Sequence, residues 1–239
     1  MHEVLHGLVS ESGARGAALG IIPLGSENAL ARHLRISLDP IKAALQQIHS
    51  SAQTIPLGKI VYEGGVRYFA LMAGVGPSGA LVYSLLAADK SKLGRAAYYL
   101  RAARLYATRR FHSFEVEYAD AASGETVRQR AASAMAVRVG SLGGLFGGLT
   151  GGHATVRDAD LQLILVSPPA LLSLPLWFLS SWLNLPGLNP FFRSMRVRSF
   201  SCRPMSAPFP HFQADGEWLG RIPIEVSIVP DALRILIPS

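Results

Sequence analysis

Four consecutive residues near the N-terminus have the types that bind phosphate groups. An apolar run over residues 18–24 is followed by Gly25, Ser26, Glu27 and Asn28, and then by a helical pattern. A helix N-terminus has unpaired N–H groups and a positive partial charge, so it attracts phosphate. Gly25 permits close approach to the backbone, Ser26 adds a hydroxyl donor and Asn28 an amide. The alternative is an ordinary capped helix with Ser26 as acceptor, and the local sequence alone favours it.

A second group of candidate residues is Asp215, Gly216 and Glu217, within the segment Ala-Asp-Gly-Glu-Trp. Asp-Gly is the commonest two-residue turn of a β-hairpin, so turn formation by itself accounts for Asp215 and Gly216. The neighbouring residues alternate as strands do, which predicts that both carboxylates lie at the tip of a hairpin.

The elements that position these residues divide into a helical N-terminal part and a β-rich remainder. Asp39 and Pro40 predict the N-cap and first residue of one helix. Tyr62 and Tyr68 flank the Gly64-Gly65 turn of a predicted hairpin. The expected elements are a helix at 2–9, a buried strand at 18–24, helices at 27–36 and 39–51, a hairpin at 55–76, a basic amphipathic helix at 91–110, two strands within 111–141, a glycine-rich loop at 140–152, a strand at 161–167, a short apolar helix at 171–183, and strands around the Asp-Gly turn in the last forty residues.

Composition narrows the class of protein. The 239 residues are 49% hydrophobic and 16% charged with a net charge of +7, which indicates a packed globular chain with an anionic partner. No nucleic-acid-binding motif is present, so we expect no nucleic acid partner. The single cysteine, Cys202, fits a reducing compartment and is interpreted as a small buried residue. Residues 1–16 lack the features of a signal peptide, so we expect a cytoplasmic protein, either free or peripheral on a membrane.

Residues 161–192 are the most membrane-like stretch of the chain. Four prolines interrupt it, so it contains no run of the roughly 20 apolar residues that a spanning helix needs. Trp177, Phe178 and Trp182 belong either to the core, which we favour slightly, or to a bilayer interface. Peripheral binding to anionic lipid is a further hypothesis, and it involves Arg101, Arg104, Arg109 and Arg110 of the basic helix, with Trp177 and Trp182 as apolar contacts.

The segment Gly-Ile-Ile-Pro-Leu-Gly-Ser-Glu-Asn-Ala, residues 20–29, resembles the nucleotide-binding segment of the diacylglycerol kinase and sphingosine kinase family. In that family a strand ends in Pro-x-Gly-[Thr/Ser]-x-Asn and a helix begins. Ser26 and Ala29 are more similar to the sphingosine and ceramide kinase branch than to the bacterial one. Further resemblances follow in the family's order, at residues 74–76, 92–98, 157–166 and 214–220.

The resemblance implies roles for particular residues. Gly25, Ser26 and Asn28 would hold nucleotide, Asp215 would act as general base on a lipid hydroxyl, and Glu217 would contact the nucleotide and its Mg²⁺. The implied cofactors are ATP and Mg²⁺. The implied partners are a lipid substrate (diacylglycerol, a sphingoid base or a related lipid) and a membrane surface. Phosphoryl transfer asks the protein mainly for positioning and charge neutralisation, which this set of residues would supply.

The chain also departs from the family's pattern. The family's Gly-Gly-Asp-Gly-Thr phosphate loop precedes a helix that resembles residues 2–8, and it is absent from this sequence. Glu27 brings a carboxylate next to the expected phosphates, which is electrostatically unfavourable. Ala29 and Ala159 replace an aspartate and a glycine, and Arg138 stands where an asparagine is common. We therefore expect a fragment of a lipid kinase with impaired activity.

Together these observations predict an α+β chain. A truncated α/β nucleotide-binding domain of the NAD-kinase-like type is expected at residues 1–53. A β-sandwich-like, lipid-binding domain is expected at residues 54–239, with the last residues returning to the first domain. The expected reaction is transfer of the ATP γ-phosphate to a lipid hydroxyl. The alternatives are a non-catalytic lipid- or partner-binding remnant of the family and a small membrane-anchored protein.

Overall fold

The computed structural model describes residues 2–9, 17–25, 28–86, 104–105, 111–119, 124–140, 154–183, 185 and 189–238. The helices of this part of the chain are α1 (His2–Val9), α2 (Ala29–His33), α3 (Pro40–Ile48), α4 (Pro77–Leu86) and α6 (Ala170–Trp182). The strands are β1 (Ser51–Tyr62), β2 (Gly65–Phe69), β3 (Met72–Val75), β4 (Phe114–Ala119), β5 (Thr126–Ala131), β6 (Ser133–Val137), β7 (Leu161–Val166), β8 (Phe192–Val197), β9 (Ser199–Pro204), β10 (His211–Ala214), β11 (Glu217–Arg221) and β12 (Ile224–Ile237).

The described strands form two six-stranded sheets that pack face to face. One sheet has the order β2-β1-β12-β9-β4-β5, and the other has the order β11-β10-β3-β6-β7-β8. Their strands pair in antiparallel fashion, and alternate residues point into the space between the sheets. Leu161, Leu163 and Leu165 of β7 enter this core, where they meet Val116 of β4 and Cys202 of β9. The sandwich predicted for the second part of the chain is therefore present.

A second core joins the sandwich to the N-terminal helices. It contains Leu5 of α1, Leu30 of α2, Ala43 of α3 and the outward-facing Ile164 of β7. Trp177 of α6 belongs to the same core and is 2% exposed. The interpretation of Trp177 as a core residue is therefore confirmed, and the bilayer contact proposed for it is wrong. The side chains of Phe178 and Trp182 lie outside the described residues.

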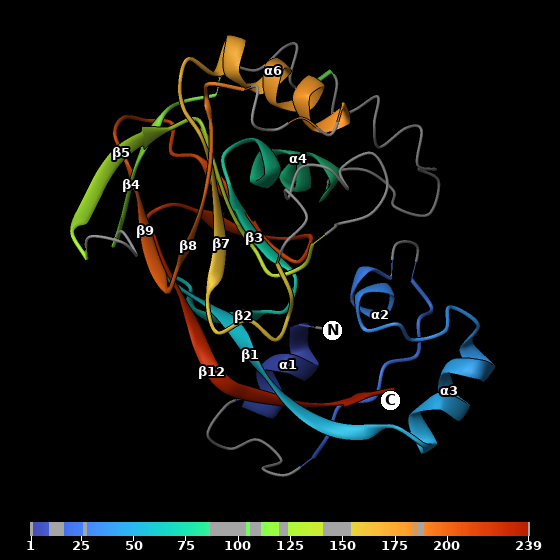
Figure 1. Ribbon diagram of the computed structural model, residues 1–239. Helices are drawn as coiled ribbons and strands as arrows, with labels where there is room; N and C mark the ends of the chain where they lie inside the picture. The colour runs from blue at the N-terminus through green and yellow to red at the C-terminus, as the bar shows by residue number, and fades with distance from the viewer. Residues whose placement is uncertain are drawn as a thin grey trace.

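Two long strands connect the sandwich with the N-terminal segment. β1 and β12 pair from Ser51↔Ile237 to Tyr62↔Ile224, with one irregularity where Pro56 of β1 lies opposite residues 230–232 of β12, and Figure 1 shows both strands curving away from the sandwich toward α3. Near the end of β12, the N–H of Leu19 donates to the carbonyl of Arg234 at 2.8 Å, and the Leu19 carbonyl accepts from the N–H of Leu236 at 2.9 Å. The N-terminal segment and the last strand therefore share backbone hydrogen bonds. The domain division at residue 53 stays a prediction.

Some predicted elements differ from the observed ones. The buried strand expected at 18–24 is wrong, because only Leu19 forms a β-bridge there, while Ile22 and Leu24 are 51% and 81% exposed. The helix expected at 27–36 is limited to α2, because Arg35 has a left-handed backbone (φ 58°) that ends helical bonding. Three strands, β4 to β6, stand where two were expected.

Other predictions hold or fall outside the described residues. The helix with Asp39 as N-cap is confirmed as α3, whose Ile41 and Lys42 N–H groups donate to Asp39 Oδ1. The hairpin flanked by Tyr62 and Tyr68 is confirmed as β1–β2. Most of the basic helix expected at 91–110, with Arg101, Arg109 and Arg110, and most of the glycine-rich loop at 140–152 lie outside the described residues.

Candidate functional site

The Asp215-Gly216 turn joins β10 to β11 and has the geometry predicted from its sequence. Ala214 pairs with Glu217, which leaves Asp215 and Gly216 as the two loop residues. Both have positive φ, 44° and 86°. This combination is that of the mirror-image turns that suit twisted hairpins, and aspartate tolerates it better than most residues. The left-handed backbone therefore turns the Asp215 side chain back toward the sheet.

The Asp215 carboxylate accepts three hydrogen bonds from a segment far away in the sequence. Oδ2 accepts from the N–H of Ala70 at 2.7 Å, and Oδ1 accepts from the N–H groups of Leu71 and Met72 at 2.9 and 2.8 Å. The backbone N–H of Asp215 donates to the Met72 carbonyl at 2.8 Å. An ionised carboxylate has about four lone-pair positions, and three are taken here. The side chain therefore anchors the hairpin tip to the connection between β2 and β3.

Arg138 is buried next to this anchor. Its backbone N–H donates to the Leu71 carbonyl at 2.8 Å. Its guanidinium, in a residue that is 1% exposed, donates to the carbonyls of Pro56 and Val156 at 2.5 Å each. Burial lowers the pKa of Arg138 to about 10, against the opposing influence of the Asp215 and Asp158 carboxylates. Arg138 thus connects Pro56 of β1 with the turn before β7 and places a positive charge near Asp215.

Glu217 lies two residues beyond the anchor and has a different environment. It is the first residue of β11 and is exposed to solvent. The next residue, Trp218, fixes the strand, because its Nε1–H donates to Nδ1 of His211 at 3.0 Å. Tyr83 of α4 stacks on His211 with ring centroids 4.4 Å apart. Glu217 therefore projects into solvent from a strand that aromatic contacts hold in place.

The Asn28 side chain makes two hydrogen bonds to the Gly25 backbone before α2. The N–H of Gly25 donates to Oδ1 of Asn28 at 2.9 Å, and Nδ2 of Asn28 donates to the Gly25 carbonyl at 2.6 Å. Asn28 is the N-cap position of α2 and has a left-handed backbone (φ 47°). Ser26 and Glu27 lie outside the described residues. The α2 helix has only five residues, so its terminal charge is smaller than the sequence pattern suggested.

A polar cavity of about 610 Å³ lies where α2, α3, β1 and β12 meet the turn before β7, and it was not predicted. His33, Arg35, Gln46, Gln53, Thr155 and Arg157 supply its polar lining. Nε2 of His33 accepts from the N–H of Val156 at 3.3 Å. Burial lowers the pKa of His33, and the nearby guanidinium groups of Arg157 and Arg138 lower it further, while Asp158 opposes them.

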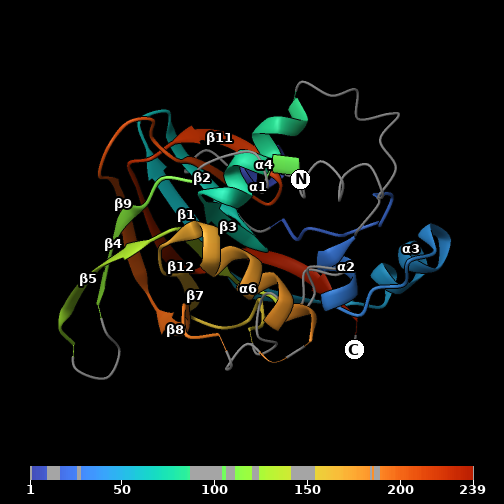
Figure 2. The same ribbon diagram turned by 90° about the horizontal axis from the view of Figure 1, so that it is seen from above.

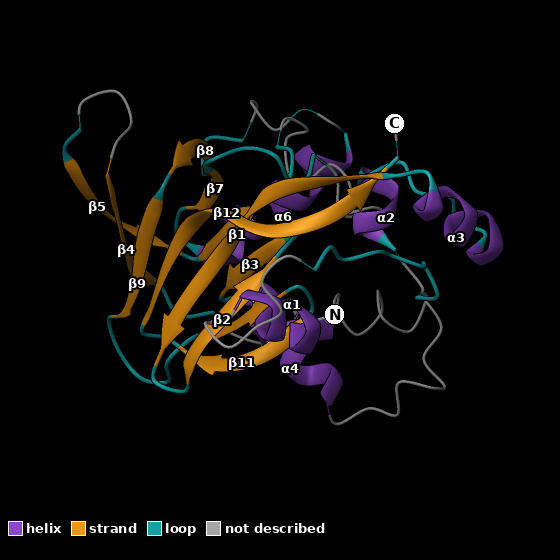
Figure 3. Cartoon of the chain, turned by 90° about the horizontal axis from the view of Figure 1, so that it is seen from below, coloured by secondary structure: helices purple, strands orange, loops and turns teal. Residues whose placement is uncertain are grey.

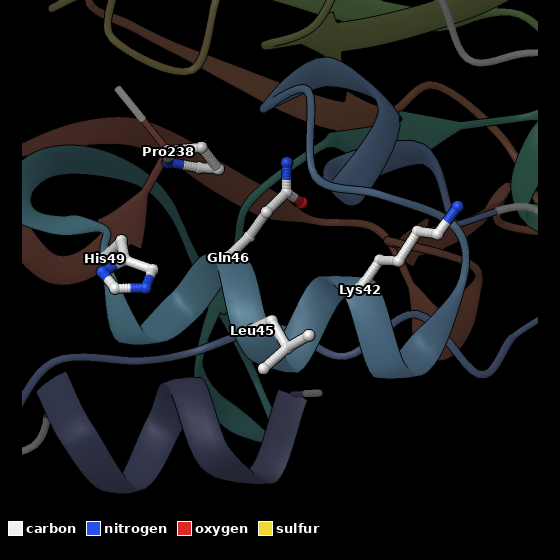
Figure 4. Close-up of a pocket in the computed structure, with 5 residues that line it drawn as sticks. All are labelled: Lys42, Leu45, Gln46, His49 and Pro238. Carbon is white, nitrogen blue, oxygen red and sulfur yellow. The ribbon is translucent and has the colours of Figure 1, made fainter.

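A shallower cavity of about 480 Å³ adjoins it. Figure 4 shows Lys42, Leu45, Gln46 and His49 projecting from α3, with Pro238 at the end of β12 across from them. Oε1 of Gln46 accepts from the N–H of Ser37 at 2.7 Å, so this side chain fixes the connection from α2 to α3. This bond therefore holds α3 against the end of the connection from α2.

The acidic residues of the segment that resembles the family at 157–166 form ion pairs. Nη1 of Arg196 lies 2.6 Å from both Asp158 Oδ2 and Asp160 Oδ1. The Asp158 carboxylate also accepts from the N–H of Thr155 at 3.0 Å. Within the part of the chain that the structure describes, no group of three or more histidine, cysteine or acidic residues is arranged to hold a metal. Mg²⁺ needs less, since one carboxylate and the substrate's phosphates often hold it, and exposed Glu217 fits that pattern.

The structure therefore assigns different surroundings to the residues predicted from the sequence. Asp215 and Glu217 lie on one hairpin, whereas Gly25 and Asn28 lie in the N-terminal segment. Besides the polar cavity, two features were missed: the three N–H groups at residues 70–72, which have no sequence signal, and the structural use of Arg138. A lone arginine inside the apolar run Ala-Met-Ala-Val-Arg-Val is such a signal, because buried guanidinium groups need fixed acceptors.

Comparison with known proteins shows which proteins parts of the chain resemble. The profile of the diacylglycerol kinase catalytic domain matches residues 1–60. A diacylglycerol kinase of Bacillus subtilis (strain 168) is 34% identical over 119 residues, which are 49% of this chain and 37% of that protein. Both similarities are to diacylglycerol kinases, over residues 1–60 and over 119 residues of the chain.

Solved structures show the shared fold over a larger part of the chain. Two crystal structures from Bacillus anthracis str. Sterne have TM-scores of 0.68 and 0.65, each with 18% identity, and each covers 92% of this chain and 68% of the other. The second is named a diacylglycerol kinase, and the first bears that name provisionally. The α+β class predicted from the sequence is confirmed. The chain spans little more than a third of the length of its Bacillus subtilis relative, as aligned.

Proposed function

We propose that this chain is the lipid-binding part, with a segment of the nucleotide site, of an ATP-dependent lipid kinase. The supporting observation is the combination of the catalytic-domain match over residues 1–60 with an intact Asp-Gly-Glu hairpin in the sandwich. The reaction would join a lipid hydroxyl oxygen to the γ-phosphorus of ATP, break the bond to ADP and release the hydroxyl proton to a base. Diacylglycerol, a sphingoid base or a related lipid is the proposed substrate, and the chain would work at a membrane surface.

The proposed roles of the residues follow from their surroundings. Gly25 and Asn28, with Ser26, would contact the nucleotide through the loop before α2. Glu217 would contact the nucleotide and Mg²⁺, which supplies charge neutralisation at the phosphates. Asp215 is the proposed base, and its three bonds to backbone N–H groups hold the carboxylate in place but stabilise its ionised form, which makes it a weak base. We therefore propose that Asp215 accepts the hydroxyl proton and also positions Glu217, and that the chain alone is a weak catalyst.

One observation favours the second candidate, a non-catalytic lipid-binding member of the family. The groups expected to do chemistry at Asn28 and Asp215 are both used in holding backbone. Such a protein would keep the lipid-binding sandwich while its nucleotide loop closes on itself.

The test is transfer of radiolabelled phosphate from ATP to mixed micelles of diacylglycerol and sphingosine. Asp215→Asn and Glu217→Gln are compared with Glu225→Gln, a substitution of another exposed glutamate, on β12. We expect weak transfer that Glu217→Gln lowers about tenfold or more with no change in melting temperature, since Glu217 is exposed. Transfer unaffected by Glu217→Gln would remove the proposed nucleotide role of Glu217. The absence of any transfer, with lipid binding retained, would favour the non-catalytic candidate.

A further inference from the structure

Helix α6 presents an apolar stripe to solvent. Its inward face consists of Ser173, Leu174, Trp177 and Ser180, all buried. Its outward face consists of leucines three or four residues apart, the spacing that aligns side chains along a helix. These leucines are Leu172 (57% exposed), Leu176 (42%), Leu179 (49%) and Leu183 (56%), with Leu171 (84%) beside them. We call Leu172, Leu176, Leu179 and Leu183 the leucine stripe.

The charges in the sequence around the leucine stripe favour an anionic lipid surface as its binding partner. Residues 161–192 contain no charged residue, and residues 161–214 contain no aspartate or glutamate. The first cation after α6, Arg193, is exposed and pairs in register with Leu165, next to the end of β7 from which the chain leads into α6. An apolar helix face in a segment without acidic residues, with an exposed cation at the same end of the sandwich, complements anionic phospholipid headgroups.

Further apolar residues lie at the same end of the sandwich. Pro204, the last residue of β9, pairs with Phe114, which pairs with Ala131. The N–H of Ala132 in turn donates to the carbonyl of Val166, which precedes α6. Met205 and Phe209, in the loop after Pro204, are 45% and 44% exposed. Figure 1 shows α6 at one end of the sandwich and α1, α2 and α3 toward the other, and Figure 2 shows α6 lying across the sheet.

We propose that the leucine stripe of α6 docks the protein on the surface of an anionic phospholipid bilayer. The stripe runs along the helix axis, so α6 would lie in the interface parallel to the membrane with Arg193 near the headgroups. Among the described residues, no helix is long and apolar enough to cross a membrane, which agrees with a helix that lies in the interface. The proposal rests on the proposed function only in that a lipid substrate makes a bilayer the natural partner.

The experiment measures sedimentation of the full chain with vesicles of phosphatidylcholine and phosphatidylglycerol, and with phosphatidylcholine alone. The test variant replaces Leu172, Leu176 and Leu179 with glutamine. The matched control replaces Ile41, Leu45 and Ile48 on α3, which have the same spacing and are exposed to 74%, 56% and 73%. We expect the α6 variant to bind about a hundredfold more weakly and the α3 control to bind like the unmodified chain. Arg193→Glu should weaken binding about fivefold, and only to vesicles with phosphatidylglycerol.

A second measurement keeps the result independent of folding and of catalysis. Cys202 is fully buried, so a cysteine introduced in place of Leu183 can be labelled selectively with an environment-sensitive dye. We expect its emission to shift to shorter wavelength with anionic vesicles, and no shift for a label in place of Ile41. The proposal is wrong if both triple variants lose vesicle binding equally. It is also wrong if the unmodified chain does not bind vesicles but forms a dimer that the α6 variant abolishes. Vesicle docking without phosphate transfer would support the docking proposal and contradict only the proposed kinase function.

Discussion

Two loops of this protein share a left-handed backbone and a polar side chain that accepts backbone hydrogen bonds, but they stabilise different parts of the structure. Asn28 and Asp215 both have left-handed backbones, and both direct side-chain oxygens to backbone N–H groups. Asn28 bonds to Gly25, three residues away and exposed. Asp215 bonds to residues 143 to 145 positions away in a partly buried setting. A polar turn residue therefore stabilises the tertiary structure only when its hydrogen-bond partners are distant in sequence and shielded from water.

The largest effect on stability is expected at Asp215, whose hydrogen-bond partners are distant in sequence. Asp215→Gly keeps the left-handed turn without strain but leaves the N–H groups of residues 70–72 without the carboxylate. We expect a loss of about 2–4 kcal/mol in the free energy of unfolding, since each unsatisfied buried N–H costs about 1–3 kcal/mol and partial hydration offsets some of this. Urea denaturation followed by tryptophan fluorescence measures it. A loss below about 1 kcal/mol would show that the three bonds contribute little.

The next largest effect on stability is expected at Arg138, the buried arginine near Asp215. Arg138→Met removes the donors to the carbonyls of Pro56 and Val156 but also removes the cost of burying a charge. We expect a net loss of about 1–2 kcal/mol. The double variant with Asp215→Gly should lose less than the two single losses added together, because each single variant already removes the electrostatic attraction between the Arg138 guanidinium and the Asp215 carboxylate. Strict additivity in the denaturation data would mean that the two groups act independently.

A smaller effect is expected at the local loop. Asn28→Gly is the matched substitution, because glycine again accepts the left-handed backbone and the same entropy is added to the unfolded chain. We expect a loss of about 0.5 kcal/mol in the free energy of unfolding, as the freed Gly25 groups can bond to water. If both glycine variants lost equal stability, sequence distance and burial would not distinguish the two loops.

The smallest effect is expected in the pH dependence of stability. The pKa of His33 is lowered in the folded protein below its ordinary value of 6.5, chiefly by burial. The unfolded chain therefore binds the proton first, so stability falls as the pH drops below about 6.5 and down through the folded pKa. Above that value the contribution is fully present. The melting temperature of the unmodified chain should fall more between pH 7 and pH 5 than that of His33→Gln, and parallel curves would contradict the assignment.

Sequence reasoning was most successful where one local signal determines one element. The Asp39-Pro40 pair specified the start of α3, and Asp215-Gly216 specified a two-residue hairpin turn, because capping and turn geometry involve only neighbouring residues. The apolar run at 18–24 misled, since its continuous hydrophobicity resembled a buried strand although Leu24 is 81% exposed. Helix α4 was not predicted, because its residues Pro77–Leu86 have only a weak difference between the two helix faces.

The candidate site was predictable only in part. The residue types at Asp215 and Glu217 followed from motif resemblance, but the different environments of the two carboxylates depend on where β2 and β3 lie in the sheets. Figure 3 shows β2 and β11 near one another although 147 residues separate their last and first members. Contacts at such separations leave no periodic pattern in the sequence. The buried role of Arg138 could be suspected from its apolar neighbours, but its acceptors could not.

The pairing of β1 with β12 also has a consequence for biosynthesis. β1 lies inside its sheet, between β2 and β12, and it leaves the ribosome long before its partner strand, residues 224–237. Until then one long edge of β1 stays without its partner, and the first sheet remains split into a β1–β2 piece and a β9–β4–β5 piece. Closure by so distant a strand is slow, and exposed strand edges invite pairing with other nascent chains. Holding of the emerging chain by a chaperone is therefore expected to matter more for yield than the stability of the finished fold.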